Sequence, residues 1–107
     1  MQFKTSSEFD KDVKRLSKKY RHIKDDLIAF MASFENEHAH ATAIRKNIFK
    51  ARIKNSDKAR GKSGGYRTYY YTITDESVTF LIIYDKSEME SIDETVLDSM
   101  IAEIEFN

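Results

Sequence analysis

The chain has no cysteine, no proline and no tryptophan among its 107 residues. Without cysteine it can form neither disulfides nor thiolate metal sites, so a reducing compartment suits it. No apolar run approaches the roughly 20 residues that a membrane-spanning helix needs. The Met1–Lys4 start also lacks the apolar core of a signal peptide. These absences predict a cytoplasmic protein that does not need a membrane.

Strong metal-binding patterns are also missing. The closest histidine pair, His38 and His40, lies in a polar stretch, and a lone His-x-His is a weak metal site. We therefore expect both rings to lie in a solvent-exposed loop, and we expect no metal ion and no other cofactor.

Glycine is scarce, with only three residues in the chain. All three, Gly61, Gly64 and Gly65, fall in one short stretch, which is the best candidate for a flexible loop. The length suits one domain over residues 1–107, with a core of modest size.

Charge of either sign is not scarce, but it is unevenly distributed. Residues 1–67 hold 17 of the 18 Lys and Arg residues and 8 acids, whereas residues 68–107 hold 10 acids and the single base Lys86. Segment 45–67 carries nine bases against the one acid Asp57. Such an excess suits a polyanion such as nucleic acid. A solvated loop with scattered bases would give the same composition, so charge alone leaves both interpretations open.

Hydrophobic spacing predicts an α+β fold with the element order β-α-α-β-β-β-α. Apolar residues recur at helical spacing over 9–20, 23–34 and 96–104. The alternating or β-rich segments 1–5, 48–54, 66–73 and 78–84 indicate strands. We expect residues 35–43 and 55–65 to be loops. The sheet should be small and antiparallel, with the N-terminal helical hairpin and the C-terminal helix packed on one face. The opposite face would then carry Lys50, Arg52 and Arg67.

Two segments resemble a known family. Lys62-Ser63-Gly64-Gly65-Tyr66-Arg67, followed by Tyr69-Tyr70, and later Leu81-Ile82-Ile83-Tyr84-Asp85-Lys86, are similar to the RelE/ParE toxins, in particular the HigB-like branch. The resemblance implies a RelE-like fold and the toxin of a type II toxin–antitoxin system. It also implies a cognate antitoxin, for which a helix-turn-helix protein is one candidate, and metal-independent cleavage of mRNA on the ribosome.

The resemblance also implies which residues act. Attack of a 2′-hydroxyl on the adjacent phosphate requires a base, cations around the phosphate and an acid for the leaving oxygen. By position, the catalytic residues would be Lys50, Arg52, Arg67 and Lys86. The family's late tyrosine or histidine acid is not matched, because Ile92 stands near its place, and Lys54 or Tyr84 would have to substitute. The expected RNA contacts are Lys54, Lys58, Arg60, Lys62, Tyr69 and Tyr84.

Each of these residues also has a purely structural interpretation. Arg67 could pair with the acidic C-terminal third, Lys50 and Arg52 could serve solubility, and Lys86 could form a weak surface ion pair. Two other functions also stay open. The superfamily includes gyrase inhibitors of the ParE kind, and an inactive relative could persist as an antitoxin-binding module.

Overall fold

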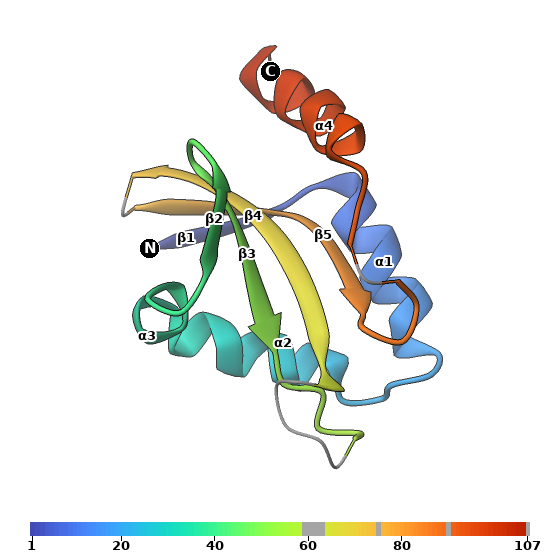
Figure 1. The fold of residues 1–107 in the computed structure, drawn as a ribbon. Coiled ribbons are helices and arrows are strands. Elements are labelled where there is room, and N and C mark those ends of the chain that lie inside the picture. Colours follow the sequence, from blue (N-terminus) through green and yellow to red (C-terminus); the bar gives the residue numbers. More distant parts are fainter. Residues whose placement is uncertain (59–63, 75, 90, 107) are drawn as a thin grey trace.

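The computed structural model describes residues 1–58, 64–74, 76–89 and 91–106. It has the expected α+β class, with helices on both sides of a five-stranded sheet of order β1-β5-β4-β3-β2 (Figure 1). The strands are β1 (Gln2–Thr5), β2 (Thr42–Arg45), β3 (Ile48–Ile53), β4 (Tyr66–Thr74) and β5 (Ser77–Asp85). The helices are α1 (Ser7–Ser17), α2 (Ile23–Ala32), α3 (Phe34–His38) and α4 (Glu94–Phe106).

The sheet is antiparallel from β2 to β5, as predicted, but its first strand is not. β1 pairs in parallel with β5, with Gln2 opposite Ser77 and Thr5 opposite Phe80. No hairpin constrains these two strands, because the rest of the sheet and three helices lie between them in the sequence. The Ser6 hydroxyl secures the junction, since it donates to the Leu81 carbonyl (2.7 Å) and accepts from the Phe9 amide (3.0 Å) at the start of α1.

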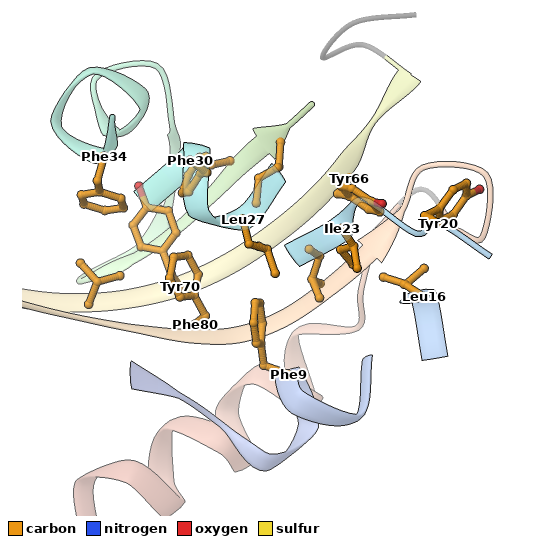
Figure 2. Packing of buried hydrophobic residues seen from close by; sticks show 14 residues of the cluster. Phe9, Leu16, Tyr20, Ile23, Leu27, Phe30, Phe34, Tyr66, Tyr70 and Phe80 are labelled. Carbon is orange, nitrogen blue, oxygen red and sulfur yellow. The ribbon is translucent and has the colours of Figure 1, made fainter. Parts of the chain in front are cut away.

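One face of the sheet is covered by α1 and α2. Their apolar residues meet Tyr66, Tyr70 and Phe80 of the central strands, and the Phe9 ring stacks on Phe80 with centroids 5.3 Å apart. Figure 2 shows these rings converging between the helices and the sheet. Such aromatic packing contributes beyond the apolar area it buries. This core accounts for the helical hairpin that the sequence predicts.

The C-terminal helix lies on the opposite face, so the prediction that one face carries all helices was wrong. Leu97 and Met100 of α4 pack with Tyr69, Ile82 and Tyr84. Figure 1 shows α4 (red) well apart from α2 and α3. The second core exists because β5 is buried on both sides.

An irregularity in β5 separates these two cores. Tyr69 pairs with Ile82 but Tyr70 pairs with Phe80, so Leu81 is an extra residue in the strand. Phe80 therefore joins the α1–α2 core, while Leu81 and Ile82 both join the core under α4.

The segment 35–43 is more ordered than the predicted loop. It contains the short helix α3 and the start of β2, which returns along β3 through a turn with Asn47 at φ 65°. The polar composition of this segment gives no sign of α3. The helix is stabilised by packing of its Phe34 ring against the Tyr70 ring of β4, with centroids 5.2 Å apart (Figure 2). In the described ranges, no helix combines the length and the apolar character needed to cross a membrane.

Candidate active site

Two arginines stand opposite each other on neighbouring strands. Arg52 of β3 and Arg67 of β4 are register partners, so both side chains leave the same face of the sheet. Arg67 is 7% exposed, and its guanidinium donates to the Tyr66 carbonyl (3.1 Å). Burial, and then the charge of Arg52, lower the pKa of Arg67, although a guanidinium keeps its proton in proteins. Two guanidinium groups on opposite residues of neighbouring strands can bind an anion strongly.

These arginines line a groove of about 590 Å³ on the sheet face. Lys50 joins them from β3, where its ammonium lies 5.5 Å from the centre of the Tyr69 ring. The remaining lining consists of Glu37 of α3, His40 of the α3–β2 turn, Thr42 and Ile44 of β2, and Ala51 of β3. The structure thus brings Lys50, Arg52 and Arg67 together, as the alternation of the strands predicts.

Gly65 sets the position of Arg67. A Cβ atom at residue 65 would lie 2.2 Å from the Ile53 carbonyl oxygen, so only glycine allows the start of β4 to approach the end of β3 this closely. The Gly65 carbonyl also accepts from the Lys86 amide (3.1 Å). One glycine therefore joins the ends of β3, β4 and β5.

We predict that Gly65→Ala destabilises the protein by about 1–3 kcal/mol, the usual cost of forcing an extra carbon into a packed site. The backbone carbonyl of Ile53 cannot rotate away as a side chain could. Chemical denaturation should show the loss, and a variant as stable as the parent would contradict the close approach.

Lys54 and Lys86 do not line the groove. Both side chains are exposed, Lys54 just after β3 and Lys86 in the turn after β5. The bond from the Lys86 amide to Gly65 places it at the same end of the sheet as Arg67. These two lysines can extend the positive surface beyond the groove.

The expected RNA contacts Tyr69 and Tyr84 are buried, 4% and 0% exposed. Their ring centroids lie 6.4 Å apart. Burial is the main cause that raises the pKa of Tyr84 far above its ordinary value, and the neighbouring Tyr69 hydroxyl is the second cause. Neither ring can stack on a base without a change in structure. Both tyrosines project from the same sheet face as the groove residues, since Tyr69 is opposite Lys50 and Tyr84 is opposite Arg67.

Lys58 is held by a buried carboxylate instead of facing outward. Its ammonium donates to Asp85 (2.6 Å), which also accepts from Ser87 and Asn55. Burial opposes the charge of Lys58 most strongly, but the hydrogen bond and charge of Asp85, with smaller contributions from Tyr20, together outweigh it and raise the pKa of Lys58. Arg60 and Lys62, the other expected contacts of this loop, lie outside the described residues.

Sequence reasoning missed the place of Glu37 and His40 in the groove, which they reach from α3 and from the α3–β2 turn. It was also wrong about His38, whose ring stacks on Phe34 (5.4 Å) and shares a 2.5 Å hydrogen bond with the Tyr70 hydroxyl. Nothing in the polar run 35–43 signals these contacts, because they depend on strands far along the chain. Among the residues that the structure covers, no three His, Cys, Asp or Glu side chains gather to hold a metal ion.

The chain is similar to known proteins in both sequence and structure. A family model described as the RelE toxin of the RelE/RelB toxin–antitoxin system matches residues 6–103. A chain of the E. coli DinJ–YafQ complex has a similar structure, with a TM-score of 0.53 and 18% sequence identity over 84% of this chain and 98% of that chain. At this low identity, the structural similarity shows a shared fold alone. The search of curated proteins returned no match.

Proposed function

The chain belongs to the RelE toxin family, and from this premise we propose that it cleaves mRNA on the ribosome and so inhibits translation. The cut would proceed without a metal, by attack of a ribose 2′-hydroxyl on the adjacent phosphate. The similarity of residues 62–70 and 81–86 to the HigB-like branch supports a place on that branch.

The observation that carries this proposal is the groove with Lys50, Arg52 and Arg67 on one wall. In the transition state, negative charge builds on the two non-bridging phosphate oxygens. Paired guanidinium groups can hold both oxygens with bidentate hydrogen bonds, and the ammonium of Lys50 adds a third positive charge. Because Arg67 is already desolvated, this electrostatic attraction is stronger than it would be in water. Lys54 and Lys86 would attract the flanking RNA backbone.

The partner of such a toxin is an antitoxin. We propose that it lies across this basic sheet face, where an acidic or helical segment would cover the groove and exclude RNA. Complementary charge would make the association fast.

The test is to map mRNA ends in cells after a short pulse of expression, beside an Arg67→Met control. Cuts inside translated codons, absent from the control and suppressed by the antitoxin, support the proposal. A DNA-damage response with intact mRNA would instead indicate gyrase inhibition. Normal growth with intact mRNA would indicate a binding module.

A further inference from the structure

The second wall of the groove carries proton-transfer groups. Glu37 of α3 and His40 of the α3–β2 turn line it together with Lys50, Arg52 and Arg67. Figure 1 shows the α3–β2 connection lying beside β3. A cationic wall and a wall with a carboxylate and an imidazole thus share one groove.

The orientation of His40 is set by a backbone contact. Its Nδ1 lies 2.9 Å from the Asn36 carbonyl oxygen. A carbonyl oxygen only accepts, so Nδ1 carries a hydrogen, and Nε2 is the atom that gains or loses a proton. The other two histidines are outside the groove, because His22 pairs with Asp57 (2.7 Å) and His38 bonds to Tyr70.

The turn that presents these groups is anchored in the core. The His38 ring packs against Phe34 and Phe49. Its Nδ1 is hydrogen-bonded to the hydroxyl of Tyr70, and Tyr70 is fully buried. These contacts immediately precede His40, so they hold the second wall at a fixed position relative to β3 and β4. Proton transfer needs such fixed geometry.

We propose that His40 is the proton donor and Glu37 the proton acceptor of the cleavage, an assignment that rests on the proposed function. The 2′-oxygen attacks phosphorus, the Glu37 carboxylate takes the 2′-hydroxyl proton, and the phosphorus–O5′ bond breaks. The protonated Nε2 of His40 gives its proton to O5′. The products are a 2′,3′-cyclic phosphate and a 5′-hydroxyl end.

The roles follow from the chemistry of the two groups. An ionised carboxylate can only accept, whereas a protonated imidazole can donate. The other charged groups lining the groove are Lys50, Arg52 and Arg67. Thr42, Ile44 and Ala51 complete the lining and carry no charge.

The experiment measures single-turnover cleavage on ribosomes programmed with two mRNAs. One has an ordinary scissile linkage, and the other has sulfur in place of the 5′-oxygen, which leaves without a proton. His40→Gln should lose about 100-fold or more on the oxygen linkage and cleave the sulfur linkage at nearly the parental rate. Glu37→Gln should be slow on both. His22→Gln, an exposed histidine outside the groove, is the matched control and should behave as the parent.

Three outcomes would count against the assignment. If His40→Gln cuts the oxygen linkage at the parental rate, His40 has no role. If it loses the same factor on both linkages while melting like the parent, His40 only positions other groups. A parent that cuts neither linkage overturns the proposed function, and this assignment with it.

Discussion

Arg67→Met is expected to reduce mRNA cleavage by about 100- to 1,000-fold, the usual effect of removing one preorganised donor to a developing charge. The same change should leave the stability of the free protein within about 1 kcal/mol of the parent. Arg67 faces Arg52 directly across the β3–β4 pair, and like charges in that position destabilise a sheet. Removing one charge relieves this repulsion, and methionine still fills the space of the arginine stem. Activity and stability should therefore respond independently.

Related variants sharpen the interpretation. Arg67→Lys should retain part of the activity, because an ammonium offers one point charge where the guanidinium offers a planar fork. Arg21→Ala, in the exposed α1–α2 turn, should cleave as the parent does. Growth arrest on induction and cleavage on programmed ribosomes provide the two readouts. A well-folded Arg67→Met protein with parental activity would show that the groove is not the phosphate site.

Asp85→Asn is expected to destabilise the protein by about 3–5 kcal/mol, the usual cost of breaking a buried ion pair from one side. Asp85 is fully buried and accepts hydrogen bonds from Lys58, Ser87 and Asn55. Asparagine has one acceptor oxygen where the carboxylate has two, and it leaves the ammonium of Lys58 without its counter-charge. Denaturant unfolding measures the effect. The matched control is Asp98→Asn, whose carboxylate is more than half exposed and pairs with Arg45. It should cost less than about 1 kcal/mol.

The same carboxylate predicts a dependence of stability on pH. Burial alone would raise the pKa of Asp85, but the bonds from Lys58 and Ser87 outweigh it and hold the pKa below its ordinary value. Its contribution to stability is therefore complete above the unfolded-state pKa of about 3.9. It is lost as the pH falls through the lower folded-state pKa. The parent should lose stability faster below pH ~4 than Asp85→Asn does. Parallel acid profiles for the two proteins would show that Asp85 is not held ionised.

The sequence predicts the cationic half of the site because that half depends on local geometry. Alternation in β3 puts Lys50 and Arg52 on one face, and Gly65, just before β4, lets that strand approach β3 so that Arg67 joins them. The proton-transfer half depends on distant contacts. His40 reaches the groove only because the preceding turn is anchored on Phe34 and Tyr70, and no period in the sequence signals that.

Two features of the fold were beyond prediction for a similar reason. Strict alternation would place Phe80 and Ile82 on the same face, but the extra residue Leu81 separates them. The face that α4 covers follows from this irregularity. The parallel direction of β1 is set by its pairing with β5, far along the chain. The sequence near residues 2–5 therefore contains no local pattern that predicts this direction.

The parallel pairing of β1 with β5 sets an order of events during synthesis. The Ser6 hydroxyl and its partner carbonyl at Leu81 are 75 residues apart in the sequence. At translation rates of about 5–20 residues per second, roughly 4–15 s pass between the synthesis of Ser6 and that of Leu81, so β1 cannot pair with β5 before then. Residues 1–67, all of which are made before Leu81, carry nine more bases than acids. This stretch is therefore polycationic while it is still attached to the ribosome, and the acidic residues 68–107 that balance its charge are added later.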